Sequence, residues 1–164
     1  MRVDTEIRYE ADPEAVATML ADPAFVSRKC ESMGALDHSV SIEGDVAAGF
    51  SATSSRTMAT DTFPDVARRF VGETVVIRQV DAWEPAAADG SRDGTLTVEI
   101  AGAPIRVTGR MRLAPVDGGT VQTVDADLKA SVPLLGGKLE KAAHPAITAG
   151  IRKEHRTAQA WLAQ

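Results

Sequence analysis

Glu154 is the residue of this sequence whose surroundings point most directly to chemistry. On a helical wheel of the C-terminal region it falls between Ile147, Ile151, Ala158 and Trp161, near the middle of an apolar face. A carboxylate in such a position must be paired with a cation, solvated within a cavity, or protonated. Two interpretations stay open: the helix is rotated enough for Glu154 to reach the rim, or Glu154 is a polar anchor in a cavity wall.

As a cavity anchor, Glu154 would need a cationic partner. Strand arginines such as Arg78 or Arg110 could supply one. A buried carboxylate of this kind could also act as the acid or base of an enzyme. The residue therefore supports a binding role and a catalytic one.

The strand expected over residues 73–83 carries further polar groups, and its inward face is ambiguous because apolar residues occur on both sides. With Trp83 pointing inwards, Gln79 and Asp81 would add polar groups to the interior. The two competing faces are Val75, Ile77, Gln79, Asp81 and Trp83 against Val76, Arg78, Val80 and Ala82.

Alternation along two other strands argues against a mechanism that uses an acid pair. Asp125 and Asp127 alternate with apolar residues over 120–132, so both carboxylates are expected to point to solvent. The neighbouring strand directs three arginines outwards by the same argument. Its outward set is Arg106, Arg110 and Arg112, and its inward set is Val107, Gly109, Met111 and Leu113.

The remaining reactive residue types match no metal, nucleophile or phosphate motif. His38, His144 and His155 lack a metal-ligand spacing such as His-Glu-x-x-His, so no metal site is predicted. Cys30 has no second cysteine to pair with and is interpreted as a small apolar packing residue. The run 136–138 (GGK) lacks the spacing and the Ser or Thr of a phosphate loop, so it is interpreted as a helix-entry corner.

These side chains are positioned mainly by one long amphipathic helix expected over residues 136–164. Apolar residues recur there at helical spacing, while the other face is basic, with Lys138, Arg152, Lys153 and Arg156. Pro145 lies inside the pattern and should kink or divide the helix near residue 144. It would either let the first turns move as a lid or fix a bend that follows the sheet.

The rest of the chain reads mainly as strands. Period-two alternation predicts strands over 3–9, 35–43, 49–60, 73–83, 95–100, 105–116 and 120–132. Asp-Pro pairs predict short helices from Pro13 and Pro23, and a short helix or crossing segment is expected within 62–71. Short turns, including one at Gly44-Asp45, favour antiparallel pairing of neighbouring strands. The expected order is strand, two short helices, six strands and a long helix.

Composition places the chain among ordinary globular proteins. Its 164 residues, 44% hydrophobic and 25% charged, fit one domain over residues 1–164. No apolar run approaches the roughly 20 residues of a membrane-spanning helix, no signal-peptide pattern opens the chain, and a cytoplasmic location is expected. A net charge of -5 with scattered arginines argues against nucleic-acid binding.

The element order and the junction 128–140 (LKASVPLLGGKLE), with Arg56-Thr57, the run 70–73 (FVGE) and Trp83, resemble the START-like (SRPBCC) superfamily. This superfamily includes birch-pollen allergens, polyketide cyclases and coenzyme Q-binding proteins. The chain is most similar to a bacterial branch of it, domain of unknown function 2505. The resemblance implies an α+β helix-grip fold: a seven-stranded curved antiparallel sheet wraps around the C-terminal helix and leaves a cavity for small apolar ligands.

The first function hypothesis is non-enzymatic binding or transport of a hydrophobic small molecule or lipid in that cavity, without a cofactor. The alternatives are a cyclase-like or hydrolase-like enzyme that uses Glu154, and a protein-interaction module that uses the outer sheet face or the short helices. The oligomeric state is left open, and no catalytic residue is assigned. The predicted ligand-binding residues are Glu154, Ile147, Ile151, Trp83, Val107, Met111, Leu128 and Phe50.

Small residues on the predicted inward faces admit two interpretations. They would leave room for a ligand, or they would allow close packing without a cavity. The set is Gly109, Ala126, Ala130, Ala143 and Gly150.

Overall fold

The computed structural model of the protein describes all residues 1–164, and its elements follow the expected order with a third short helix inserted. That helix, α3, lies where a short helix or crossing segment is expected. The strands are β1 (Arg2–Tyr9), β2 (Asp37–Asp45), β3 (Gly49–Ala59), β4 (Thr74–Trp83), β5 (Arg92–Ile100), β6 (Ile105–Val116) and β7 (Gly119–Ala130). The helices are α1 (Pro13–Leu20), α2 (Pro23–Ser32), α3 (Asp65–Val71) and α4 (Gly136–Leu162).

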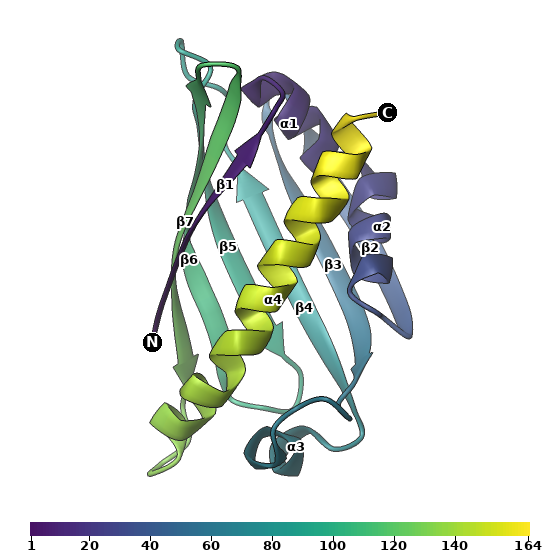
Figure 1. Cartoon of the computed structure of the whole chain (residues 1–164), viewed down its shortest axis with the longest axis vertical. Coiled ribbons are helices and arrows are strands. Elements are labelled where there is room, and N and C mark those ends of the chain that lie inside the picture. The colour runs from purple at the N-terminus through teal and green to yellow at the C-terminus, as the bar shows by residue number, and fades with distance from the viewer.

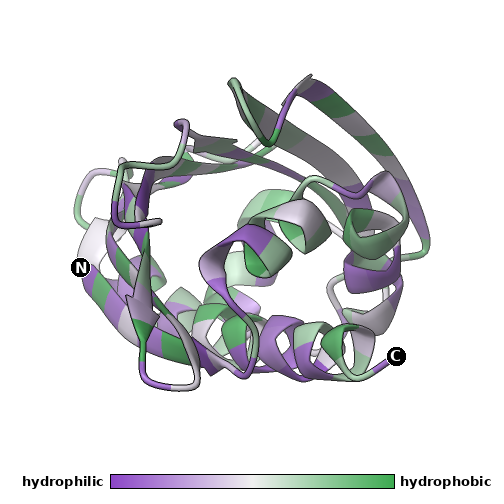
Figure 2. Ribbon diagram, turned by 90° about the horizontal axis from the view of Figure 1, so that it is seen from above, coloured by the Kyte–Doolittle hydropathy of each residue, from purple (hydrophilic) through white to green (hydrophobic).

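All seven strands form one antiparallel sheet in the order β1-β7-β6-β5-β4-β3-β2. Strands β2 to β7 pair with their sequence neighbours, and β1 returns to pair with β7. The sheet curves around α4, with α1 and α2 near one end of the molecule and α3 at the other (Figures 1 and 2). This is the α+β helix-grip fold expected from the sequence.

Local sequence signals account for the starts of α1 and α2. The Asp12 carboxylate accepts a hydrogen bond from the Ala15 N–H at 2.8 Å, and Asp22 accepts one from Ala24 at 2.8 Å. Proline follows each aspartate, at a helix position where its missing N–H costs nothing. The two helices therefore begin where the Asp-Pro pairs predict.

The first hairpin differs from the expected one. Gly44 and Asp45 belong to β2, where they pair with Phe50 and Gly49, so the turn itself covers residues 46–48. The Asp45 carboxylate accepts a hydrogen bond from the Ala48 N–H at 2.7 Å. Because aspartate stabilises the turn that follows it, the Gly44-Asp45 pair marks the end of the strand and not the turn.

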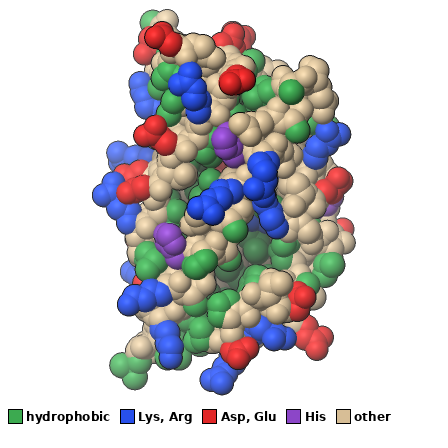
Figure 3. All heavy atoms as spheres, viewed as in Figure 1, with side chains coloured by type: hydrophobic (Ala, Val, Ile, Leu, Met, Phe, Trp, Pro, Cys, Tyr) green, Lys and Arg blue, Asp and Glu red, His purple; other side chains and the backbone are tan.

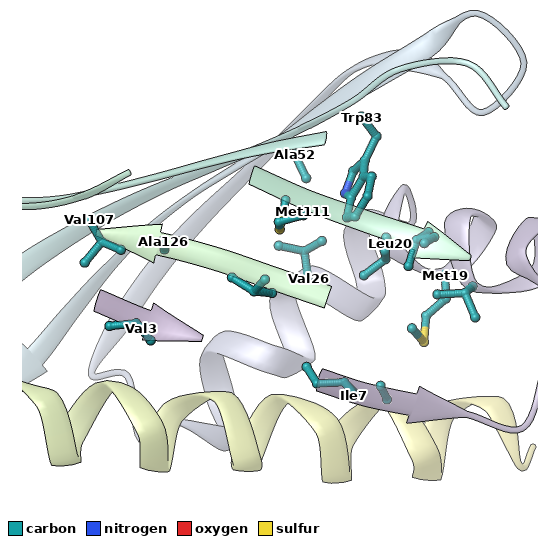
Figure 4. Packing of buried hydrophobic residues seen from close by; sticks show 14 of the residues in the cluster. Val3, Ile7, Met19, Leu20, Val26, Ala52, Trp83, Val107, Met111 and Ala126 are labelled. Atoms are coloured by element: carbon teal, nitrogen blue, oxygen red, sulfur yellow. The ribbon is translucent and has the colours of Figure 1, made fainter. Parts of the chain in front are cut away.

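The expected inward and outward faces of β6 and β7 are confirmed. Val107, Met111 and Leu113 are buried, whereas Asp125 and Asp127 are exposed on the outer face. Figure 4 shows Val107 and Met111 on the side of the sheet that faces Val3, Ile7 and α4. Arg106, Arg110 and Arg112 are exposed.

Helix α4 supplies the surface on which the sheet closes. It packs against β1, β7, α1, α2 and α3, and its Trp161 ring meets Phe25 edge to face at 5.6 Å. It runs without a break through Pro145 for 27 residues, so of the two effects expected of this proline, a kink or a division near His144, the division is absent. None of the helices combines the length and the apolar character that crossing a bilayer requires.

Candidate functional site

A cavity of about 390 Å³ lies between the sheet and α4. Its wall has 35 residues, 25 of them hydrophobic, contributed by α4, most of the strands, and the segment that contains α3. On the face that α4 crosses, the surface is hollowed below the middle of the helix, and hydrophobic side chains are visible inside (Figure 3). The volume and the mostly apolar lining fall within the range of small-molecule pockets in proteins.

Seven of the eight predicted ligand-binding residues lie in the cavity wall. Phe50 does not, although it is buried with an exposed fraction of only 4%. It stands at the first hairpin, opposite Trp83 in the ladder, where its side chain joins the packed core. The wall residues among the eight are Glu154, Ile147, Ile151, Trp83, Val107, Met111 and Leu128.

Some of the small residues leave room for a ligand, and others allow close packing. Ala126, Ala143 and Gly150 line the cavity, and a Cβ added to Gly150 would have no other atom within 4 Å. At Gly109, in contrast, a Cβ would lie 2.5 Å from the Cα of Ala126 on β7. Gly150 therefore leaves open space beside α4, whereas Gly109 permits close approach of two strands.

Strand β4 presents Trp83, Asp81 and Gln79 to the interior, so the ambiguous strand face is resolved. All three line the cavity and are at most 9% exposed. Val76 and Arg78 lie on the outer face and are exposed. The cavity wall therefore holds a carboxylate and an amide beside the indole.

Glu154 is paired with a cation, but with a different one from those expected. Its Oε1 accepts a hydrogen bond from Lys29 Nζ of α2 at 3.1 Å. Arg78 and Arg110, the partners considered from the sequence, are exposed because the outer face of the sheet carries them. Lys29 Nζ also lies 3.8 Å from Asp81 Oδ2, so one lysine bridges two carboxylates.

Hydrogen bonds extend the network from Asp81 through Gln79 of β4 to an arginine of β3. The Gln79 amide donates to both oxygens of Asp81 at 3.1 Å, and its Oε1 accepts from Arg56 Nη1 at 3.3 Å. We call Lys29, Arg56, Gln79, Asp81 and Glu154 the polar cluster. All of its members except Lys29 line the cavity.

Burial and charge act in opposite directions on the ionisable groups of the polar cluster. Burial raises the pKa of Asp81, an effect that Lys29 opposes. Burial by itself would lower the pKa of Lys29, but Glu154 and Asp81 outweigh it, so the pKa is raised. Lys29 is therefore a permanent cation at neutral pH. Burial also lowers the pKa of Arg56.

His38 stands opposite Arg56 in the β2–β3 ladder and His155 directly follows Glu154, but both histidines hydrogen-bond to groups outside the polar cluster. His38 Nε2 lies 2.5 Å from Ser27 Oγ, and the His155 ring packs edge-on against Tyr9 at 5.8 Å. Tyr9 is fully buried and donates a hydrogen bond to Gln122 in the cavity wall at 3.0 Å. Cys30 is buried and unpaired, as its interpretation as a packing residue requires.

Two members of the polar cluster, Lys29 and Arg56, have no site role in the predictions from the sequence, where Arg56 enters only through the family resemblance. Lys29 follows Phe25 and Val26 at helical spacing, which places it on the buried face of α2. Arg56 follows Phe50, Ala52 and Ser54 at alternate positions of β3. Each pattern predicts that a charged side chain lies on the buried face of its element.

Solved structures with the same fold have low sequence identity to this chain. The STAR-related lipid transfer protein from Xanthomonas axonopodis is 14% identical with a TM-score of 0.64, over 99% of this chain and 86% of that one. TTHA0849 from Thermus thermophilus is 13% identical with a TM-score of 0.60, over 98% of each chain. Ara h 8.0201 is 15% identical with a TM-score of 0.59, over 100% of this chain and 99% of that one. These likenesses establish the START-like fold.

Sequence relatives come from mycobacteria. The uncharacterized proteins Rv0481c of Mycobacterium tuberculosis and Mb0491c of Mycobacterium bovis are each 27% identical over 92 residues, which are 52% of this chain and 50% of theirs. The match thus spans about half the length of these curated relatives. The model of the family described as "Protein of unknown function (DUF2505)" matches residues 4–162, and the chain therefore belongs to the DUF2505 family.

Proposed function

We propose that the protein binds or transports a hydrophobic small molecule or lipid in the cavity between the sheet and α4, without converting it. The cavity carries this proposal: about 390 Å³ of space with 25 hydrophobic residues among the 35 that line it. Binding sites for small molecules have volumes of about 300–1,000 Å³ and mostly apolar walls. The description of one structural neighbour as a lipid transfer protein supports lipids as a ligand class to test.

An apolar ligand would be bound mainly by dispersion contacts and by removal of its surface from water. Atoms that border a space have dispersion partners on one side only, and an apolar ligand supplies partners on the other. Each CH₂ group transferred from water to this wall contributes about 0.8 kcal/mol. Affinity should therefore rise with ligand size until the cavity is filled.

Native mass spectrometry of the protein purified from its own source tests this function directly. We expect a stoichiometric apolar compound that organic solvent extracts. Protein stripped of it should bind the neutral dye Nile red saturably at one site. A protein without any bound compound that also fails to take up Nile red would refute the proposal.

Gly150→Leu tests whether the dye occupies this cavity. The new side chain would extend into the open space beside α4 and should abolish Nile red binding. Gly137→Leu is the matched control, because Gly137 is also on α4 with no atom within 4 Å of an added Cβ, but it lies outside the cavity wall. Unchanged Nile red affinity of a folded Gly150→Leu variant would contradict the assignment.

A second candidate function, a cyclase-like or hydrolase-like enzyme, is favoured by the two carboxylates in the wall. Asp81 and Glu154 border an apolar cavity and share Lys29, an arrangement that could move a proton at a bound ligand. The extracted compound, incubated with the stripped protein, would then yield a new product in mass spectra. Glu154→Gln should abolish that conversion, and an unchanged rate would exclude Glu154 as the acid or base.

A further inference from the structure

Arg56 is a buried cation without an anionic partner in the protein. The residue is 9% exposed and lines the cavity. It takes part in none of the ion pairs of the chain, whose buried members join Lys29 to Glu154 and Asp81. Its one side-chain hydrogen bond goes from Nη1 to the neutral Gln79 amide. A buried charge is ordinarily paired, because losing its hydration is costly.

The unused donors of Arg56 are open to a ligand. A guanidinium has five N–H donors, and the Nε and Nη2 atoms of Arg56 donate to no atom of the protein. No enclosed side-chain nitrogen or oxygen of the protein lacks a hydrogen-bond partner. Nε and Nη2 are therefore not enclosed, and the space that Arg56 borders is the cavity.

The charges around Arg56 select the kind of group that fits there. Lys29 and Arg56 carry two positive charges against the two carboxylates Glu154 and Asp81, but only Lys29 lies within ion-pair distance of them. The Gln79 amide stands between Asp81 and Arg56. A group with a single negative charge would pair with Arg56, whereas a second negative charge would be repelled by the two carboxylates. A carboxylate has two oxygens that match the parallel N–H groups of a guanidinium.

We propose that the ligand is an amphiphile with one carboxylate, whose head group binds the Arg56 guanidinium and whose apolar body fills the cavity. The proposal rests on the function proposed above and specifies the chemical class of the ligand. The hydrophobic part of the wall would bind the body, and Arg56 would fix its orientation. Neutral apolar molecules of the same size would bind without that head-group contribution.

The test compares matched acids and alcohols by isothermal titration calorimetry on the stripped wild-type protein. Dodecanoate and dodecanol form one pair, and 1-pyrenebutyrate and 1-pyrenebutanol form a second pair with a different shape. We expect at least one acid to bind about 10- to 100-fold more tightly than its alcohol, the range that a charge-assisted hydrogen bond provides. This comparison requires no variant. Equal affinities within both pairs would overturn the proposal.

Arg56→Met assigns the preference to this residue, and Arg110→Met is the matched control, which should keep the preference for the acid. Arg110 is exposed on the outer face of the sheet and lies outside the cavity wall. Arg56→Met should reduce acid affinity to that of the alcohol and leave alcohol binding unchanged, which also shows that the cavity is intact. An unaltered preference for the acid in Arg56→Met would overturn the proposal.

Two further outcomes separate this inference from the proposed function. Binding of the alcohols and Nile red without preference for the acids would refute the role of Arg56 and leave the carrier function standing. Failure of every probe to bind, Nile red included, would refute both. Dodecyl phosphate, tested in the same way, should bind more weakly than dodecanoate, and stronger binding would contradict the preference for a single charge.

Discussion

Lys29→Met removes the cation that bridges Glu154 and Asp81 and replaces it with an apolar side chain of similar length. The lysine side chain is 4% exposed, and those of Glu154 and Asp81 are 17% and 13% exposed. Removal of one partner from a buried ion pair lowers the free energy of unfolding by about 3–5 kcal/mol. We expect a loss in that range at pH 7.5, a large part of the 5–15 kcal/mol or so that is typical of a domain.

The loss of stability in Lys29→Met should depend on pH, and the pKa of Asp81 determines whether it grows or shrinks as the pH falls. Folding raises the pKa of Asp81 above 3.8, so its contribution to stability is complete below pH 3.8 and is lost as the pH rises through the folded-state value. Without Lys29 that pKa rises further, and protonation relieves the uncompensated charge at a higher pH. The raised pKa of Lys29 keeps its own contribution intact at every pH below 10.5. The stability gap between variant and wild type should therefore narrow from pH 7.5 to pH 4.5.

Urea denaturation of both proteins at pH 7.5 and pH 4.5 measures the gap. Lys153→Met is the control, because Lys153 is exposed at the cavity rim and forms no ion pair, and its effect should stay within about 0.5 kcal/mol. The double variant Lys29→Met/Glu154→Gln should recover part of the loss. Wild-type stability of Lys29→Met at pH 7.5, or a loss of equal size at both pH values, would refute this reasoning.

Two further substitutions test packing around the cavity. Gly109→Ala would place a Cβ 2.5 Å from the Ala126 Cα and should lower the free energy of unfolding by about 1–3 kcal/mol in urea denaturation, whereas Gly137→Ala should cause no loss. Equal stability of these two variants would contradict the close approach of β6 and β7. Tyr9→Phe removes the buried donor to Gln122 and should cost about 1–3 kcal/mol in the same assay. Unchanged stability would show that this hydrogen bond contributes nothing.

Most of the fold could be predicted because its signals are local. Alternation along β6 and β7, the Asp-Pro helix starts and the apolar face of α4 each depend on neighbouring residues, and each matches the structure. The first hairpin was misplaced because Gly44 and Asp45 are turn-forming residues that the structure uses at the end of β2. The continuity of α4 through Pro145 depends on packing along the whole helix, which sequence spacing does not contain.

The sequence suggests strand arginines as partners of Glu154, whereas the structure pairs it with Lys29 of α2. Lys29 lies four residues after Phe25 and three after Val26, both fully or almost fully buried. It therefore has the same kind of position on α2 that Glu154 has on α4: one charge on an otherwise apolar face. Two opposite charges so placed on two helices that pack together predict an ion pair between those helices, and α2 does contact α4. The structure was needed only to show that α2 and α4 pack together.

The position of Arg56 could not be predicted from alternation along β3, because the pattern does not identify the buried face where its residues are polar. Phe50, Ala52, Ser54 and Arg56 occupy one face of β3, and all four are buried. Hydropathy along this face falls towards Arg56, so the strand alone does not distinguish the interior from solvent. The pairing of β3 with β4 shows that Arg56 points to the interior, because it pairs with Ile77 and lies on the same face as Gln79.

The polar cluster is difficult to explain by stability alone. A buried ion pair replaced by apolar residues of similar volume is often neutral or stabilising, so Lys29, Asp81 and Glu154 contribute less than their short distances suggest. Arg56 adds a desolvated charge that Glu154 and Asp81 offset only in part, because burial still lowers its pKa. Since burial disfavours this cation, an anionic ligand would gain affinity from the same charge that lowers the stability of the free protein. The protein should consequently become more stable on binding a carboxylate than on binding a neutral molecule of equal size.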